Sequence, residues 1–119
     1  MISVVDDDAS VREATKSLLR SLGYRATVFS SAEEFLRSED AKHAVCLITD
    51  VQMPGLSGLE LYERLVDAGR SIPVIFITAF PEEKIRRWAL ARGACGFLKK
   101  PFDEQSLIGC IDRALAEPA

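Results

Sequence analysis

The stretch VVDDDAS, residues 4–10, joins two apolar β-branched residues to three consecutive aspartates. Carboxylates this close together repel one another, and a carboxylate buried without a partner is strongly destabilising or becomes protonated. The stretch therefore indicates either a solvated turn after a strand, or a strand that ends where a positively charged group binds. The pattern of the remaining chain favours the second interpretation.

Short apolar runs alternate with segments of helical periodicity along the whole chain. Runs that are apolar on both faces, separated by amphipathic helices, are typical of a parallel sheet covered by helices on each side. We therefore expect an α/β fold of the doubly wound (βα)5 type, with one five-stranded parallel sheet. The predicted strands are residues 2–5, 26–29, 45–48, 74–77 and 96–98.

The intervening helices carry start and stop signals. Ser31 and Ser57 are each followed three residues later by a glutamate, which predicts a capping box at the start of a helix. Pro81 fits the first turn of a helix that runs to Gly93, and Asp103 caps the last helix. The residues expected to face the core are Val11, Ala14, Leu18 and Leu22 in the first helix, Leu59, Tyr62, Leu65 and Val66 in the third, and Leu107, Ile111 and Leu115 in the last.

Length and composition indicate a single globular domain over residues 1–119, with 48% apolar and 28% charged residues. The sequence has no apolar run long enough to span a membrane, and its first residues lack the features of a secretion signal. The net charge is −3, without a basic stripe. We therefore expect a cytoplasmic domain that contacts neither membranes nor nucleic acid directly.

Several residue types that often bind metals or partners have plainer interpretations here. Cys46, Cys95 and Cys110 are odd in number and lack metal-type spacing, so we expect small apolar side chains in a reducing compartment. His43 is isolated beside a lysine in a predicted loop, which indicates a solvated side chain. Trp88 lies among arginines, and both a half-buried surface position and an interface position stay open for it.

Polar residues that follow the predicted strands form the candidate site. In an open parallel sheet, ligands bind beyond the carboxyl ends of the strands, where the strand order reverses. Asp6 and Asp7 follow the first strand, Asp50 the third, Thr78 the fourth and Lys100 the fifth. Three converging carboxylates need a cation, and their hard oxygens suit Mg²⁺, which favours phosphate oxygens. The sequence therefore predicts a Mg²⁺ (or Mn²⁺) site for phosphoryl transfer.

Four segments in this order resemble the receiver domain of bacterial two-component response regulators: VVDDD (4–8), ITDVQMPGLSGLEL (48–61), VIFITA (74–79) and FLKKPF (97–102). The resemblance covers essentially the whole chain, and TAFPEE with GACGFLKKPF is most similar to the FixJ/NarL-type transcriptional regulators. It implies a flavodoxin-like sheet with strand order 2-1-3-4-5. It also implies a signalling switch that takes a phosphoryl group from a sensor histidine kinase.

Matched residue by residue, the resemblance implies that Asp50 is the phosphoacceptor. Asp7, Asp50 and the backbone carbonyl of Gln52 would hold Mg²⁺ directly, and Asp6 would act through a bound water. Asp8 is more simply explained as a solvated residue at the start of the first helix.

The resemblance also implies a set of residues that respond to phosphorylation. Thr78 would contact the phosphoryl group, Lys100 would pair with it, and Phe97 takes the position of the aromatic switch residue. Lys99 should point away from the site, because neighbouring residues on a strand face opposite sides. The Lys100–Pro101 peptide bond is expected to be cis.

The implied partners are a histidine kinase and a second copy of the chain. Homodimerisation would depend on phosphorylation and would use the fourth helix, the fifth strand and the last helix. The chain would then be a phosphoacceptor domain that catalyses its own phosphotransfer and autodephosphorylation, not an enzyme with other substrates. A part of a DNA-binding transcription regulator, with an output domain after residue 119, and a single-domain receiver that acts by protein contact both stay open.

Two other classes of protein use related sites. Mg²⁺-dependent phosphohydrolases of the haloacid-dehalogenase type also have an aspartate nucleophile, but their usual Asp-x-Asp pair is absent, since Gln52 follows Asp50 by two positions. A flavodoxin-like FMN binder needs a Ser/Thr/Gly-rich phosphate loop after the first strand, where this chain has DDDAS. Both alternatives explain the sequence less well than a phosphorylation switch.

Overall fold

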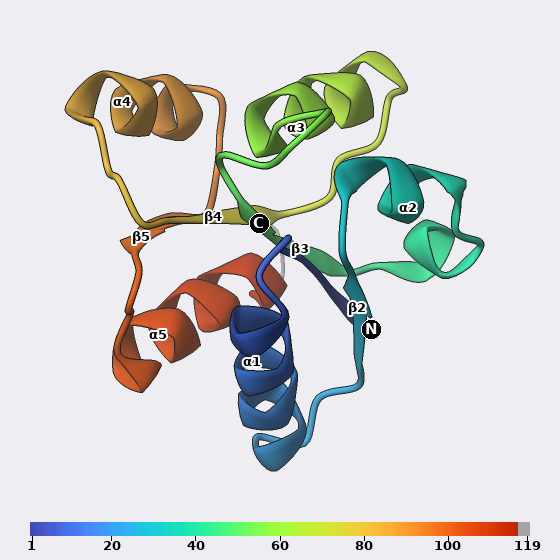
Figure 1. The fold of residues 1–119 in the computed structure, drawn as a ribbon, viewed down its shortest axis with the longest axis vertical. Coiled ribbons are helices and arrows are strands. Elements are labelled where there is room, and N and C mark those ends of the chain that lie inside the picture. Colours follow the sequence, from blue (N-terminus) through green and yellow to red (C-terminus); the bar gives the residue numbers. More distant parts are fainter. Residues whose placement is uncertain (117–119) are drawn as a thin grey trace.

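A computed structural model describes residues 1–116, which form one α/β layer structure. Five parallel strands pair in the order β2-β1-β3-β4-β5. Helices α1 and α5 cover one face of the sheet, and α2, α3 and α4 cover the other (Figure 1). The predicted fold and strand order are confirmed. The elements are β1 Ile2–Val5, α1 Ala9–Ser21, β2 Ala26–Phe29, α2 Ala32–Arg37, a 3₁₀ helix at Asp40–His43, β3 Cys46–Asp50, α3 Gly58–Asp67, β4 Val74–Thr78, α4 Glu83–Ala91, β5 Gly96–Lys99 and α5 Glu104–Leu115.

The central strands are buried on both faces, as their continuous apolar sequences predict. Every residue of β1, β3 and β4 is buried. β3 begins one residue later than predicted, at Cys46, where its pairing with Ile2 of β1 starts, and it extends to Asp50. This extension makes Asp50 the last residue of a buried strand.

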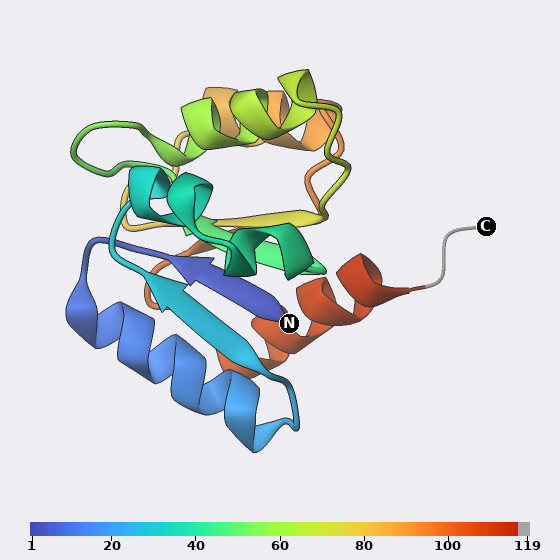
Figure 2. The same ribbon diagram turned by 90° about the vertical axis from the view of Figure 1, so that its right-hand side faces the viewer.

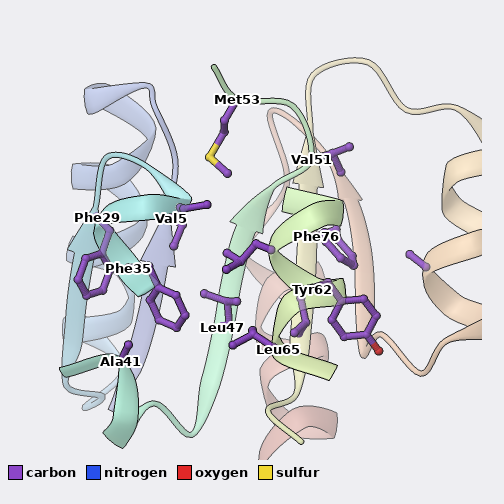
Figure 3. Close-up of a cluster of buried hydrophobic side chains, with 14 residues drawn as sticks. Val5, Phe29, Phe35, Ala41, Leu47, Val51, Met53, Tyr62, Leu65 and Phe76 are labelled. Atoms are coloured by element: carbon purple, nitrogen blue, oxygen red, sulfur yellow. The ribbon is translucent and has the colours of Figure 1, made fainter. Parts of the chain in front are cut away.

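The two faces of the sheet have different cores. The core under α2, α3 and α4 is rich in aromatic residues, with Phe29 packed edge-on against Phe35 and Tyr62 packed edge-on against Phe76 (Figure 3). The core under α1 and α5 consists mainly of aliphatic residues and two cysteines. Its buried members are Ile2, Val4, Leu19, Cys46, Ile48, Ile75, Ile77, Leu107, Cys110, Ile111 and Ala114.

The predicted capping boxes are present in full at one helix and in half at another. At α3, Ser57 Oγ accepts from the Glu60 N–H and the Glu60 carboxylate accepts from the Ser57 N–H. At α2, Ser31 Oγ accepts from the Glu34 N–H, but the Glu34 carboxylate binds the N–H of Ser30 instead of that of Ser31. The carboxylate of Glu34 therefore accepts from the residue that precedes the N-cap, and the capping box is incomplete.

Three predicted helix faces are wrong in detail. In α1, Thr15 and Leu19 are buried, whereas Ala14 and Leu22 are exposed and Val11 and Leu18 are half-buried. In α3 and α5 the packing also differs from the simple apolar pattern, because the neighbouring elements decide which side of each helix is covered. In α3, Leu61 is buried and Val66 is exposed. In α5, Cys110 and Ala114 are buried and Leu115 is exposed.

The fourth helix starts later than predicted. Pro81 precedes the helix, which begins at Glu83 after Glu82 as N-cap residue and ends at Ala91. The residues between β4 and this helix form a bend, in which the Phe80 N–H donates to Thr78 Oγ1 at 3.1 Å. Within residues 1–116, no helix is long and apolar enough to cross a membrane.

Candidate functional site

The candidate site lies at the edge where the strands end. Parallel pairing brings the last residues of β1, β3 and β4 to the same edge, next to the loop that follows β3 (Figure 2). The chain moves from β1 to β2 on one side and then returns to β3 on the other side of β1. The strand order therefore reverses here, which is where a ligand is expected in this class of sheet.

Three carboxylates converge at this edge. Asp6 and Asp50 are buried, with 0% and 6% of their surface exposed, whereas Asp7 is exposed. One carboxylate oxygen of each residue lies within 4.8 Å of the other two. Two buried charges and one exposed charge of the same sign thus share one small region.

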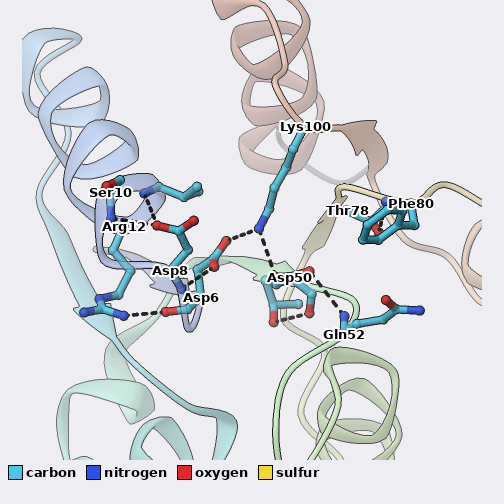
Figure 4. A network of polar contacts seen from close by, with 11 residues as sticks. Asp6, Asp8, Ser10, Arg12, Asp50, Gln52, Thr78, Phe80 and Lys100 are labelled. Carbon is cyan, nitrogen blue, oxygen red and sulfur yellow. Dashed lines mark hydrogen bonds and ion pairs between the residues drawn. The ribbon is translucent and has the colours of Figure 1, made fainter.

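The Lys100 ammonium group lies between the two buried carboxylates (Figure 4). Its Nζ is 2.7 Å from Asp6 Oδ2 and 2.9 Å from Asp50 Oδ2, and 14% of its side chain is exposed. The contact with Asp50 is also a hydrogen bond, whereas the contact with Asp6 is an ion pair that leaves Oδ2 without an aligned donor. Lys99 is exposed, so only Lys100 reaches the acids. The Lys100–Pro101 peptide bond is cis.

Burial and charge shift the pKa values of the site in opposite ways. Burial raises the pKa of Asp6, although the neighbouring Lys100 ammonium and the hydrogen bond from the Asp8 backbone favour its ionised form. For Lys100, burial lowers the pKa, but the contacts with Asp6 and Asp50 outweigh this effect and raise it. The lysine therefore stays protonated and offsets part of the repulsion between the carboxylates.

The segment after β1 is held by short hydrogen bonds. Asp6 Oδ1 accepts from the Asp8 N–H at 2.9 Å, and the Asp8 carboxylate caps α1 by accepting from Ser10 and Val11. Asp8 thus starts the helix and lies outside the carboxylate group of the site. Arg12 donates through Nη1 to the backbone carbonyl of Asp6 at 2.8 Å.

The loop after β3 packs tightly around Asp50. The Gln52 N–H donates to Asp50 Oδ1 at 3.2 Å, and the Gly58 N–H donates to the Val51 carbonyl at 2.9 Å. A Cβ on Gly58 would lie 1.9 Å from the backbone oxygen of Asp50. Only glycine therefore fits where the start of α3 meets the end of β3. Thr49 is buried and donates through Oγ1 to the Asp50 carbonyl at 3.1 Å.

Thr78 and Phe97 lie on neighbouring strands beside the acids. Thr78 is buried at the end of β4, and its hydroxyl oxygen accepts from the Phe80 N–H. Phe97 is half-buried on β5 opposite Phe76, with ring centroids 6.4 Å apart and planes inclined by 52°. The hydroxyl of Thr78 and the ring of Phe97 thus lie on adjacent strands at the side of the sheet that α4 covers.

Other polar or reactive side chains lie away from this edge. His43 is exposed in the 3₁₀ helix. Cys46 and Cys110 are buried, and burial raises the pKa of the Cys46 thiol to about 12. Trp88 is half-buried, lies edge-on to Tyr62 and stacks under the Arg92 guanidinium, 4.0 Å from the ring centroid.

Two contacts of the site could not be found from sequence patterns. Arg12 fixes the end of β1 from α1, and Glu33 on α2 bonds through Oε2 to the Leu56 N–H in the loop after β3. Both side chains occupy helix positions at which a charged residue usually faces solvent. Only the placement of the helices against the loops reveals their contacts.

The donor set fits a hard divalent cation. Carboxylate oxygens and a backbone carbonyl are the ligands that Mg²⁺ uses in proteins. Asp6 Oδ2 is buried and pairs with the Lys100 ammonium at 2.7 Å without an aligned hydrogen bond, so it can also accept from a water of an added cation. The three carboxylates within 4.8 Å supply more negative charge than Lys100 alone can neutralise.

Comparison with known proteins places this geometry in one family. Residues 2–112 match the response regulator receiver domain family. The chain is 44% identical over 115 residues to the response regulator protein TmoT of Ectopseudomonas mendocina, and the match covers 97% of this chain and 52% of that protein. It is 37% identical over 120 residues to the transcriptional regulatory protein FixJ of Bradyrhizobium diazoefficiens, and this match covers 99% of this chain and 58% of that protein.

Solved structures show the same fold. The crystal structure of FixJ-N superimposes with a TM-score of 0.85 at 33% identity, covering 99% of this chain and 94% of that one. A response regulator receiver protein from Burkholderia phymatum gives a TM-score of 0.82 at 45% identity, covering 99% of this chain and 96% of that one.

The chain spans about half the length of the curated relatives that it matches, some of which are transcriptional regulators. The family match extends over nearly all the described residues and includes every strand end of the acidic site. The chain therefore belongs to the receiver domain family of two-component response regulators.

Proposed function

We propose that this domain is a signalling switch that accepts a phosphoryl group on Asp50 from a sensor histidine kinase. The observation that carries the proposal is the position of Lys100, whose ammonium touches both Asp6 and Asp50 beside the exposed Asp7. A lysine between carboxylates at the end of a parallel sheet can neutralise the oxygens of a phosphoryl group on Asp50. The domain is therefore a phosphoacceptor and has no substrate apart from its phosphodonor.

Mg²⁺ would be held by Asp7, Asp50 and the Gln52 backbone carbonyl, with Asp6 acting through a water. When bound, the ion neutralises charge on the transferred group. In the transfer, an Asp50 carboxylate oxygen forms a bond to phosphorus while the bond between phosphorus and the kinase histidine nitrogen breaks, and the imidazole takes up a proton. Lys100 keeps its proton and stays paired with the charged oxygens throughout.

The phosphoryl group would change the surface through Thr78 and Phe97. Phosphorylated Asp50 gains strong acceptor oxygens, and the buried Thr78 hydroxyl on the neighbouring strand can donate to one of them. Movement of Thr78 toward Asp50 opens space beside β4, and the half-buried Phe97 ring turns into it. The surface formed by α4, β5 and α5 then favours a homodimer, which in a longer regulator controls transcription.

The direct test is phosphorylation by a small-molecule donor. Wild-type protein is incubated with acetyl phosphate and Mg²⁺ and analysed by intact mass and peptide mapping. We expect the mass of one phosphoryl group on Asp50, its absence in Asp50→Asn, and its retention in Asp8→Asn, which changes an aspartate of the helix cap. Modification of another residue, or none with Mg²⁺ present, would contradict the proposal. Turnover of phosphomonoesters would instead support a phosphohydrolase.

A further inference from the structure

A carboxylate outside the acid site holds the loop that carries Gln52. Glu33, in the first turn of α2, accepts a hydrogen bond through Oε2 from the Leu56 N–H at 3.1 Å. Its other oxygen, Oε1, is buried and has no hydrogen-bond partner. The two residues lie 23 positions apart, so this contact joins α2 to the loop between β3 and α3.

Gly55 gives the Glu33 carboxylate access to the loop. The φ angle of Gly55 is +76°, a conformation that other residues rarely adopt. A Cβ at Gly55 would lie 2.5 Å from Glu33 Oε2 and 3.4 Å from Glu33 Cδ. The glycine therefore permits both the turn and the close approach of the carboxylate to the next amide.

The surroundings of Glu33 favour its ionised form. The nearby backbone N–H of Glu33 itself and the hydrogen bond from the Leu56 N–H lower the pKa of Glu33, and the charges of Arg37 and Arg64 lower it further. Because the acceptor is ionised, its bond to the Leu56 N–H is of the stronger, charge-assisted kind. The contact is therefore suited to fix a loop instead of merely covering it.

The side chain of Leu56 is partly buried against the aromatic core, and the rest of the loop is held at its two ends. At its start, the Gln52 N–H binds Asp50 and the side chain of Met53 is buried in the aromatic core. At its end, the Gly58 N–H binds Val51. Pro54 and Gly55 are exposed between these points, so the Glu33 contact fixes the backbone amide that directly follows the exposed turn.

We propose that Glu33 is a positioning residue for the acid site. By fixing the Leu56 amide, it holds the loop in the conformation that presents the Gln52 carbonyl beside Asp50, and so strengthens Mg²⁺ binding without touching the ion. This role rests on the proposed function, which assigns the Gln52 carbonyl to the metal. With this role, the residues that shape the site include one from α2, the helix that contacts the loop through Glu33.

Two conservative variants separate the reach of Glu33 from its charge. Glu33→Asp keeps the charge but is too short to reach Leu56, whereas Glu33→Gln keeps an oxygen at the right distance but loses the charge. Mg²⁺ is titrated into each protein and followed by calorimetry. We expect Glu33→Asp to bind Mg²⁺ on the order of tenfold more weakly, and Glu33→Gln, which keeps an acceptor but not the charge, to lose clearly less. Glu39→Ala, which removes an exposed acid that pairs with Lys42, should change nothing.

A second measurement reports on the loop without metal. Amide hydrogen exchange of Leu56, followed by NMR in Mg²⁺-free protein, should be faster in Glu33→Asp than in Glu33→Gln or wild type. Equal Mg²⁺ affinity in all proteins, or equal losses in Glu33→Asp and Glu33→Gln, would overturn the positioning role. If wild type itself binds no Mg²⁺, the proposed function fails as well. Unchanged binding by Glu33→Asp in a protein that does bind Mg²⁺ removes only this inference.

Discussion

The two edges of the sheet are built from opposite chemistry. Where the strands end, the carboxylates of Asp6 and Asp50 and the ammonium of Lys100 are packed together with little exposure to solvent. Where the strands begin, Cys46 and Cys110 lie in an apolar core, and Cys110 Sγ fills the space beside Gly96. Charge is concentrated at one edge and almost absent from the core at the other.

The difference between the two edges shows where burial of side chains stabilises the fold and where burial of charge opposes it. Apolar burial at the starting edge contributes about 25 cal/mol per Å². At the ending edge, burial raises the pKa of Asp6, which means that its ionised form is disfavoured in the folded protein. Lys100 offsets part of this cost, and a bound cation would offset more. Changes at the two edges should therefore differ in their effects on stability and on phosphorylation.

The largest expected effect is that of Gly58→Ala at the acidic edge. The added Cβ would lie 1.9 Å from the backbone oxygen of Asp50, and the buried strand cannot move away. We expect the free energy of unfolding to fall by about 3 kcal/mol, measured by urea denaturation, together with loss of Asp50 phosphorylation by acetyl phosphate. A variant with wild-type stability would show that the start of α3 can shift freely.

Gly96→Ala should damage the other edge without touching the site. Its Cβ would lie 2.4 Å from Cys110 Sγ, and the expected loss is about 1–2 kcal/mol in urea denaturation. Because the clash is with a side chain, the loss should shrink in a Cys110→Ala background, as a double-mutant cycle would show. Phosphorylation of Asp50 in the folded variant should be unchanged. Equal losses in both backgrounds would assign the cost to the backbone of β5.

Asp7→Asn should stabilise the metal-free protein while weakening Mg²⁺ binding. Asp7 is exposed and has no contact with Lys100, so it adds repulsion to Asp6 and Asp50 without compensation. We expect a gain of about 1 kcal/mol or less in the absence of metal. Thermal melts with and without Mg²⁺ test this, because the ion should stabilise wild type far more than the variant. Lower stability of the variant without metal would argue against a crowded acidic pocket.

Thr78→Ala should have the smallest effect on stability and a clear effect on signalling. Loss of the hydroxyl that accepts from Phe80 should lower the free energy of unfolding by about 0.5–1 kcal/mol. The variant should still accept a phosphoryl group on Asp50, yet form less dimer than wild type with beryllofluoride and Mg²⁺ in sedimentation velocity. Thr78→Ser, which keeps the hydroxyl, is the control. Equal dimerisation of Thr78→Ala and wild type would remove Thr78 from the coupling.

Helix ends and faces illustrate how far local patterns can be read. The capping box at Ser57 and Glu60 is present as predicted, because all its atoms lie within one turn. The predicted burial of Val66 and Leu115 is wrong, and Leu61 and Cys110 are buried in addition to the predicted residues. Apolar spacing shows that a helix has a buried side, but the neighbours that pack against it choose the side.

The sequence by itself determined the order of elements, the parallel sheet and the residues that end its strands. These features depend on local apolar runs and on the rule that parallel strands end at one edge. Only the tertiary structure decided that Lys100 bridges Asp6 and Asp50, that Arg12 holds the end of β1, and that Glu33 reaches Leu56. Each of these contacts joins separate elements over a few ångströms, and no pattern of neighbouring residues encodes such a distance.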